Sequence, residues 1–166
     1  MKNLYVHKYK PKSLDDVIQL FPKLSYFRNI SPQNFMHMIW VGNVSVDIST
    51  VLLQRLYPDM KRTKQEEPKI EYYKSAYHIE IDASQYNFSL IHSLIMQYVS
   101  TRNIHTNSFT IVIIQNCEHI PKKHQSKLKI FFEKFTDTCR IIFIGKTKSN
   151  LSSCICSNCM NIKTFS

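Results

Sequence analysis

Glycine is almost missing from this sequence: only two of 166 residues are glycines, Gly42 and Gly145. Loops that wrap nucleotide phosphates use several glycines, because their backbone adopts conformations that are closed to other residues. The scarcity of glycine therefore argues against a standard nucleotide-hydrolysing enzyme.

Long apolar runs and a disulfide pattern are missing as well. No run approaches the roughly 20 apolar residues of a membrane-spanning helix. The opening MKNLYVHKYKPKS carries charges and a proline where a signal peptide has its apolar segment. The five cysteines are an odd number, which favours free thiols over a disulfide framework. We expect a soluble intracellular protein that does not contact a membrane.

Positive charge is abundant. The net charge is +10 and the isoelectric point is near 9.4. Lysines that neutralise phosphates release counterions, so a basic protein is suited to a polyanion such as DNA. A lysine-rich surface that serves only solubility has the same composition, and charge alone does not separate the two.

The pattern of apolar residues predicts one α/β domain over residues 1–166. Short runs rich in β-branched residues alternate with segments of helical period, which is typical of a parallel sheet. Residues 59–77 are polar and contain a proline, which predicts an exposed insertion or a hairpin. The expected strands are Met36–Val41, His78–Asp82, Phe109–Gln115, Arg140–Ile144 and Asn161–Thr164, and the expected helices are Ser49–Tyr57, Asn87–Thr101 and Lys122–Phe135, with a turn near Asn150–Ser157.

The segment WVGNVSVDIST, residues 40–50, has the outline of a phosphate-binding loop. Such a loop reads G-x-x-x-x-G-K-[ST], and its lysine reaches the terminal phosphates. Gly42 and Ser49 match this pattern, but the second glycine is Asp47 and the lysine is Ile48. A carboxylate about 4 Å from a phosphate would be repelled by about 4 kcal/mol at a surface-like dielectric. We therefore expect Asp47 to cap the following helix in place of a phosphate.

Three further segments carry a resemblance to a known family. They are LYVHKYKPKSLDDV (residues 4–17), HIEIDAS (78–84) and the tail that runs from CRIIFI (139–144) through residues 149–159. Together they resemble the first domain of the small subunits of replication factor C, the sliding-clamp loader of the AAA+ class. The resemblance implies a three-layer P-loop NTPase base domain with a five-stranded parallel sheet flanked by helices. It also implies that the lid and collar domains of that family are absent.

The resemblance places the family's catalytic positions on residues with other chemistry. The phosphate-loop lysine falls on Ile48, and the magnesium-binding acid and the catalytic glutamate fall on Gln115 and Asn116. The sensor asparagine falls on Lys146, and the trans-acting arginine falls on Asn158; Glu118 is the acid that remains near the second motif. Phosphoryl transfer depends on positioned charge. We expect no ATPase activity, no catalytic residues and no cofactor.

A DNA surface is expected on the predicted helix 122–135. In the family, helix N-termini and basic side chains track duplex phosphates. The candidate DNA-binding residues are Lys122, Lys123, Lys127 and Lys129, with a solvated lysine face as the alternative. The helix Asn87–Thr101 occupies another DNA-tracking position in the family, but it presents His92 and Met96 there.

The cysteines offer a metal alternative. Cys154, Cys156 and Cys159 would need Cys139 or Cys117 as a fourth ligand for zinc. Their C-x-C-x-x-C spacing differs from the paired C-x-x-C of zinc ribbons. We expect free thiols and no metal.

These expectations combine into a non-catalytic, clamp-loader-like protein. It would bind duplex or primer-template DNA, a sliding clamp or loader subunits, at a nuclear or cytoplasmic replication site. The isoleucine-, asparagine- and lysine-rich composition suits an A+T-rich genome such as that of a large DNA virus, whose replication site would be the viral factory. Two alternatives stay open: a structural or host-interaction protein that keeps only the fold, and a nucleotide-sensing switch without hydrolysis.

Overall fold

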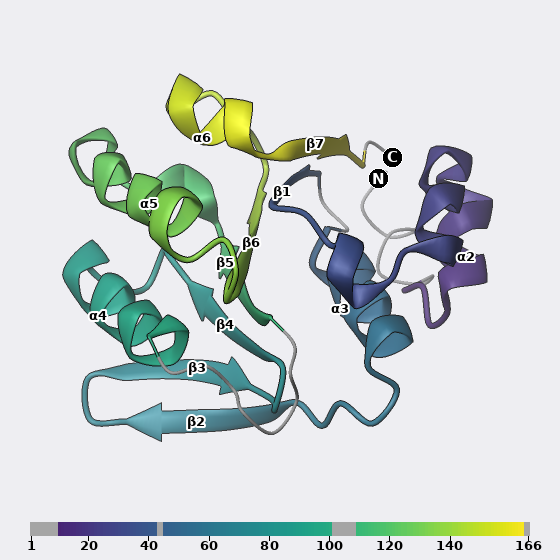
Figure 1. Ribbon diagram of the computed structural model, residues 1–166, viewed down its shortest axis with the longest axis horizontal. Helices are drawn as coiled ribbons and strands as arrows, with labels where there is room; N and C mark the ends of the chain where they lie inside the picture. Colours follow the sequence, from purple (N-terminus) through teal and green to yellow (C-terminus); the bar gives the residue numbers. More distant parts are fainter. Residues whose placement is uncertain (1–9, 43–44, 101–108, 165–166) are drawn as a thin grey trace, which may run out of the picture.

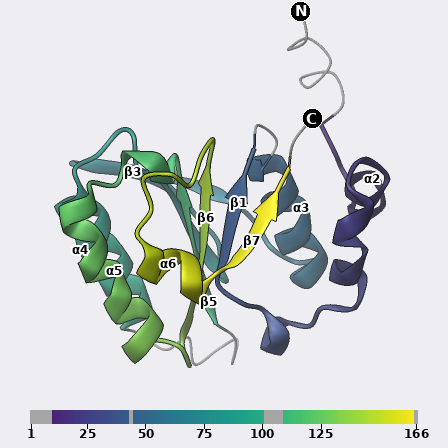
Figure 2. The ribbon, with the colours of Figure 1, turned by 90° about the horizontal axis from the view of Figure 1, so that it is seen from above.

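The structure is a computed structural model that describes residues 10–42, 45–100 and 109–164. These residues form one central sheet between two layers of helices (Figures 1 and 2). The strands are β1 (Met38–Val41), β2 (Thr63–Glu67), β3 (Ile70–Lys74), β4 (His78–Asp82), β5 (Thr110–Gln115), β6 (Cys139–Gly145) and β7 (Met160–Lys163). The helices are α2 (Leu14–Leu20), α3 (Ser45–Leu56), α4 (Phe88–Val99), α5 (Lys122–Lys134) and α6 (Ser153–Asn158), with 3-10 segments η1 (Pro22–Asn29), η2 (Pro32–Asn34) and η3 (Cys117–His119).

The sheet contains the five predicted parallel strands. They pair in the order β4-β5-β6-β1-β7. The carboxyl ends of these strands therefore meet at one edge, where open α/β sheets bind ligands. The predicted α/β fold class is confirmed.

Both faces of the central strands are buried because their side chains alternate between two apolar layers. Val112 and Ile114 of β5 face the layer of α4, α5 and α6, whereas Ile111 and Ile113 face the layer of α2, η1 and α3. Figure 2 shows these layers on opposite sides of the sheet. The continuous apolar run in β5 thus reflects a strand covered on both sides.

The segment before β1 folds into α2 and η1, which the sequence patterns did not predict. Ser13 and Asp16 form a capping box at the start of α2, and Val17 is buried. Phe27 of η1 stacks on Trp40 of β1, with ring centroids 5.8 Å apart. This segment closes one side of the second apolar layer.

The predicted hairpin at residues 59–77 is confirmed, but it is part of the sheet, so the prediction of five strands is corrected to seven among the described residues. Within it, β2 and β3 form an antiparallel hairpin, and β3 also pairs with β4. Ile70 and Tyr72 of β3 are buried. The polar composition of β2 reflects its place at the edge of the sheet, where charged side chains discourage pairing with another chain.

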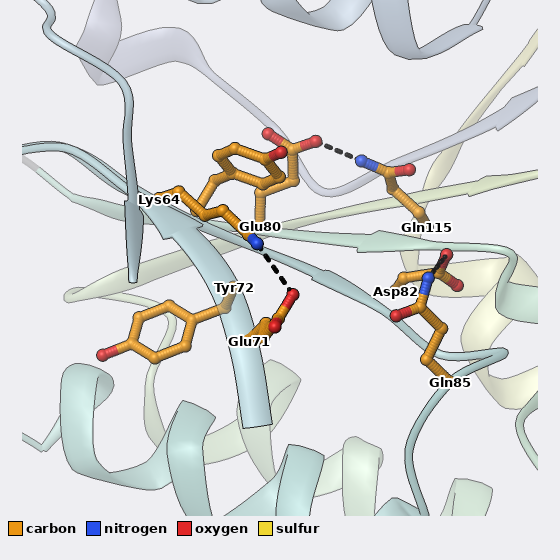
Figure 3. A pocket seen from close by; sticks show the side chains of 8 residues that line it. Lys64, Glu71, Tyr72, Glu80, Asp82, Gln85 and Gln115 are labelled. Atoms are coloured by element: carbon orange, nitrogen blue, oxygen red, sulfur yellow. Dashed lines mark hydrogen bonds and ion pairs between the residues drawn. The ribbon is translucent and has the colours of Figure 1, made fainter. Parts of the chain in front are cut away.

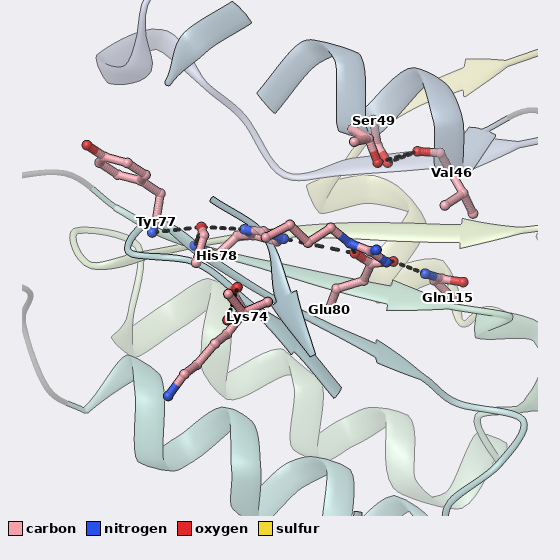
Figure 4. Close-up of polar contacts among 11 residues, drawn as sticks. Val46, Ser49, Lys74, Tyr77, His78, Glu80 and Gln115 are labelled. Carbon is pink, nitrogen blue, oxygen red and sulfur yellow. Dashed lines mark hydrogen bonds and ion pairs between the residues drawn. The ribbon is translucent and has the colours of Figure 1, made fainter. Parts of the chain in front are cut away.

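An ion pair with a buried carboxylate joins the hairpin to the parallel strands. Arg62, directly before β2, donates from Nε and Nη2 to the Glu80 carboxylate at 2.8 and 2.9 Å. The side chain of Glu80 is 2% exposed, and His78 Nε2 lies 3.9 Å from it. Burial would raise the pKa of Glu80, but the nearby His78 and the hydrogen bonds from Arg62 outweigh burial and hold this pKa below its usual value. Figure 4 shows this row of polar contacts across the strands.

We predict that Arg62→Met destabilises the protein by about 2–3 kcal/mol, because it leaves a buried carboxylate without its main partner. The double variant Arg62→Met/Glu80→Met is expected to recover part of that loss, since no buried charge remains. Urea unfolding measures both. Lys64→Met removes exposed pairs with Glu66 and Glu71 and serves as the control, with an expected change below about 1 kcal/mol. A loss of that small size in Arg62→Met would contradict the anchoring role.

A second prediction concerns His37, whose Nδ1 accepts a hydrogen bond from the Ile141 N–H at 3.1 Å. Burial, together with the charge of Arg140, lowers the pKa of His37 from 6.5 to about 4. The unfolded chain therefore takes up a proton at a higher pH than the folded chain, and stability falls as pH drops from 6.5 toward 4.

His37→Asn keeps an acceptor and removes the titration. As the pH falls through that window, we expect the free energy of unfolding of this variant to decrease by about 1–3 kcal/mol less than that of the native protein. Urea unfolding at pH 7 and at pH 4.5 provides the comparison. Equal losses in the two proteins would show that other groups carry the pH dependence.

Candidate functional site

The segment that resembles a phosphate-binding loop is already helical where a loop was expected. Helix α3 begins at Ser45, four residues before the predicted start. Asp47 therefore lies within the first turn of α3 and not before the helix, so its predicted position is corrected. Its carboxylate lies 3.6 Å from Lys10 Nζ, and a negative charge in the first turn is stabilised by the helix dipole.

The two residues at the lysine and hydroxyl positions of the motif face the protein interior. Ile48 is 1% exposed and packs in the apolar layer with Leu52 and Trp40. Ser49 is also 1% exposed, and its hydroxyl donates to the Val46 carbonyl at 2.8 Å (Figure 4). Neither side chain is therefore open to solvent.

Gly42, the matched glycine of the motif, is required by packing. Its φ is +144°, and a Cβ placed on it would lie 1.9 Å from the Thr164 carbonyl oxygen. The chain just beyond β7 passes directly over this position, since the Thr164 N–H donates to the Val41 carbonyl at 2.8 Å. The glycine therefore serves the contact between β1 and the end of the chain.

At the carboxyl ends of β4 and β5, amides and carboxylates form pairs. Gln115 donates from its side-chain amide to Glu80, and Asn116 donates from Nδ2 to Asp82 Oδ1 at 2.8 Å. Burial raises the pKa of Asp82, but hydrogen bonds from Asn116 and Ser84 outweigh it and lower the pKa. The acids Glu80 and Asp82 lie on β4, whereas Gln115 ends β5 and Asn116 follows it. The resemblance to the clamp-loader family places the acids after β5 instead.

Asn116 has a left-handed backbone conformation, with φ 52° and ψ 44°. Asparagine tolerates this region better than most residues, because its short side chain hydrogen-bonds locally. The conformation turns the chain from β5 into η3, where Glu118 follows. Glu118 lies against Gly145, and its Oε2 is buried without a hydrogen-bond partner among the described residues.

A cavity of about 260 Å³ lies between the hairpin and the ends of β4 and β5 (Figure 3). Two of the residues that line it form an ion pair, with Lys64 Nζ 2.9 Å from Glu71 Oε2. Three carboxylates face one lysine here, so the cavity disfavours an anionic ligand such as a phosphate. Its lining residues are Lys64, Glu71, Tyr72, Tyr73, Glu80, Asp82, Gln85 and Gln115.

The sequence patterns identified Gln115 and Asn116 but missed the partners of these amides. Glu80 and Arg62 were not singled out. The available signal was the position of Glu80, a charged residue between two isoleucines of a strand that is buried on both faces. A charge in such a strand requires a partner.

The four candidate DNA-binding lysines lie together on α5, as predicted, and all four are exposed. Lys122 and Lys123 occupy the first turn, where Pro121 provides no side-chain cap. Positive charges at this end of a helix oppose the helix dipole. Lys129 Nζ lies 3.2 Å from Glu133, which raises the pKa of Lys129.

The other predicted positions are at the surface. Lys146 follows β6 and is exposed, and Asn158 ends α6, where its Nδ2 donates to the Cys154 carbonyl at 2.8 Å. In α4, which occupies the family's other DNA-tracking position, His92 is half-buried and packs between Phe88 and Phe131. Thr101, the predicted end of that helix, lies outside the described residues, as do residues 4–9 of the first resembling segment.

The cysteines are free thiols in the structure. Burial raises the pKa of Cys117, Cys139 and Cys159 to about 12, so these thiols hold their protons at neutral pH. In the described ranges, no group of three or more His, Cys, Asp or Glu side chains could hold a metal ion. The same residues contain no helix long and apolar enough to cross a membrane.

No protein-family model matches the chain. Among curated proteins, replication factor C subunit 3 of Arabidopsis thaliana is 24% identical over 186 residues, covering 96% of this chain and 52% of that protein. The replication factor C small subunit of Staphylothermus marinus is 24% identical, over 94% of this chain and 45% of its own length. The chain thus spans about half the length of the curated relatives that it matches.

Solved structures agree on the fold. The RuvB Holliday junction branch migration motor of Thermotoga maritima superimposes with a TM-score of 0.60 at 14% identity, over 93% of this chain and 48% of that chain. A DNA polymerase III gamma subunit-related protein of the same organism gives a TM-score of 0.51 at 13% identity, over 87% of this chain and 45% of that chain. The chain has the three-layer AAA+ P-loop fold, and its curated relatives are replication factor C small subunits.

Proposed function

We propose that the protein is a non-catalytic, clamp-loader-like AAA+ domain that acts by binding DNA and replication partners. The observation that carries this proposal is the inward orientation of Ile48 and Ser49, which are both 1% exposed. The partners proposed from its relatives are a sliding clamp and other loader subunits. Replication of a large DNA virus is the proposed setting.

The loss of catalysis is supported by what occupies each charged position of the resembling family. Phosphoryl transfer is accelerated mainly by positioned cations and metal ligands. Here the lysine position is the buried Ile48, and the acid positions are Gln115 and Asn116, whose amides are already bonded to Glu80 and Asp82. The hydroxyl of Ser49 is bonded to a carbonyl of its own helix.

DNA binding is supported by the charge arrangement of α5. Lys122 and Lys129 lie seven residues apart, and Lys123 and Lys127 lie four apart, so they form two adjacent stripes on the exposed face. Lysines in an uncapped first turn are destabilising without an anion, and a phosphate would compensate both the side chains and the backbone N–H groups. Such a surface would read the shape of a duplex and not its sequence.

We predict that ATP and magnesium leave the unfolding temperature of the native protein unchanged. A ligand at 100 times its dissociation constant would add about 2.7 kcal/mol of stability. Ile48→Lys is expected to lose several kcal/mol, because it places an ammonium in the apolar layer, and to gain no nucleotide response.

Ile48→Val is the matched control, with an expected loss of about 1 kcal/mol. Differential scanning fluorimetry with and without ATP and magnesium measures all three proteins. A clear upward shift of the native protein would favour the nucleotide-sensing alternative.

The DNA surface predicts a steep salt dependence of binding to a primer-template duplex. Lys122, Lys123, Lys127 and Lys129 are changed together to alanine, and the slope of log K against log salt is expected to fall by up to about 0.9 for each lost phosphate contact. Fluorescence anisotropy across a salt series gives the slope.

A control variant changes four exposed lysines on other segments to alanine: Lys12, Lys61, Lys69 and Lys146. It removes the same charge and is expected to keep most of the slope. If both variants lose the slope equally, the binding is a general effect of net charge. If the native protein does not bind the duplex near physiological salt, the result favours the alternative of a structural or host-interaction protein.

A further inference from the structure

The two outer strands of the sheet differ in how they discourage pairing. β2 carries Lys64, Glu66 and Glu67, all exposed, which is the usual protection of an edge. β7 at the opposite edge has the sequence Met-Asn-Ile-Lys, with one charge at its end. Among the described residues, β7 is the last strand of the sheet beside β1 (Figures 1 and 2). The β7 edge is thus the less protected one.

Hydrogen-bond direction identifies which backbone groups of β7 point outward. The Met160 N–H donates to the His37 carbonyl at 2.9 Å, and the Thr164 N–H donates to the Val41 carbonyl at 2.8 Å. Along a strand these groups alternate in direction, so the N–H and carbonyl of Asn161 point away from β1. The side chain of Asn161 does not cover them, because its Nδ2 is turned to the carbonyls of Cys156 and Cys159.

A groove runs along this edge. Its volume is about 380 Å³, and its walls are β7 and η1. Leu24, Met160 and Ile162 give it an apolar floor, and Tyr26 closes part of it by donating a hydrogen bond from Oη to Met160 Sδ at 2.8 Å. Tyr26 is 41% exposed. The groove matches β7 in extent, since it is lined by all four residues of that strand.

The charge around the groove has one sign. Lys23 lines it from η1 and Lys163 from β7, and Lys148 Nζ lies 3.2 Å from Asn161 Oδ1. Among the described residues, no carboxylate lines it. Edge-strand addition takes its affinity from main-chain hydrogen bonds and its preference from the flanking side chains. A basic rim on an apolar floor therefore suits an extended segment in which acidic and apolar residues alternate.

We propose that the β7 edge, with the groove formed by Leu24, Tyr26, Met160 and Ile162, binds an extended acidic peptide segment of a partner protein by adding it as a strand beside β7. The site lies on β7 and η1, apart from the α5 lysines. The peptide site and the DNA surface can therefore be tested independently.

The test uses a fluorescein-labelled octapeptide of alternating valine and glutamate, titrated with the full chain and followed by fluorescence anisotropy. Asn161→Pro removes the outward N–H without removing a bond to β1, and proline is tolerated on edge strands in this position. Asn161→Ala is the matched control, because both variants lose the same side-chain amide. We expect Asn161→Pro to weaken binding about tenfold relative to Asn161→Ala, and Lys23→Glu to weaken it by a similar factor.

Circular dichroism of each variant checks that the fold is retained, and a peptide of alternating valine and lysine checks the preference for acid. Equal binding by Asn161→Pro and Asn161→Ala would overturn the proposal, as would no binding of the acidic peptide at about 1 mM, the weak end of specific affinity. The proposal would also be overturned if binding of the acidic peptide were lost only in the variant whose α5 lysines are changed to alanine. Unchanged duplex binding by Asn161→Pro is expected and separates this surface from the DNA surface.

Discussion

The carboxylate of Glu80 is 2% exposed, and a buried charge costs several kcal/mol unless it is paired. The need to pair this charge constrains the positions of the segments that supply its partners. Arg62 comes from the segment before the hairpin, His78 from the same strand, and Gln115 from the neighbouring strand. The hairpin therefore lies where the guanidinium of Arg62, directly before β2, reaches Glu80. The end of β5 carries the amide of Gln115, which donates to the same carboxylate.

The same pairing defines the chemistry at the carboxyl edge of the sheet. In a parallel sheet this edge is the natural place for a ligand, because the ends of the strands converge there. In this chain the polar groups at the ends of β4 and β5 bind one another: Gln115 with Glu80, and Asn116 with Asp82. On the other side of β6, α3 begins early and directs Ile48 into the core.

The sequence predicted the elements whose signals are local. The β-branched runs located the five parallel strands, and the proline and the apolar spacing located α5 at Lys122–Lys134. It did not predict that residues 59–77 extend the sheet, because β2 is polar on both sides and its pairing depends on Arg62 and β3. The helix start at Ser45 was also missed, since a glycine followed by a serine-threonine pair has the outline of a loop. At the candidate site, residue identities were predictable, but the Glu80 and Asp82 partners come from a strand distant in sequence.

Trp40 is the chain's single tryptophan, fully buried in β1 and stacked on Phe27 of η1. Its indole lies in the apolar layer that also holds Ile48 of α3 and Ile162 of β7. Tryptophan emission shifts to longer wavelength when the ring meets water. The protein therefore contains a built-in optical reporter for this layer, and loosening of η1, of the start of α3 or of the β7 edge would be visible in the intrinsic fluorescence without any label.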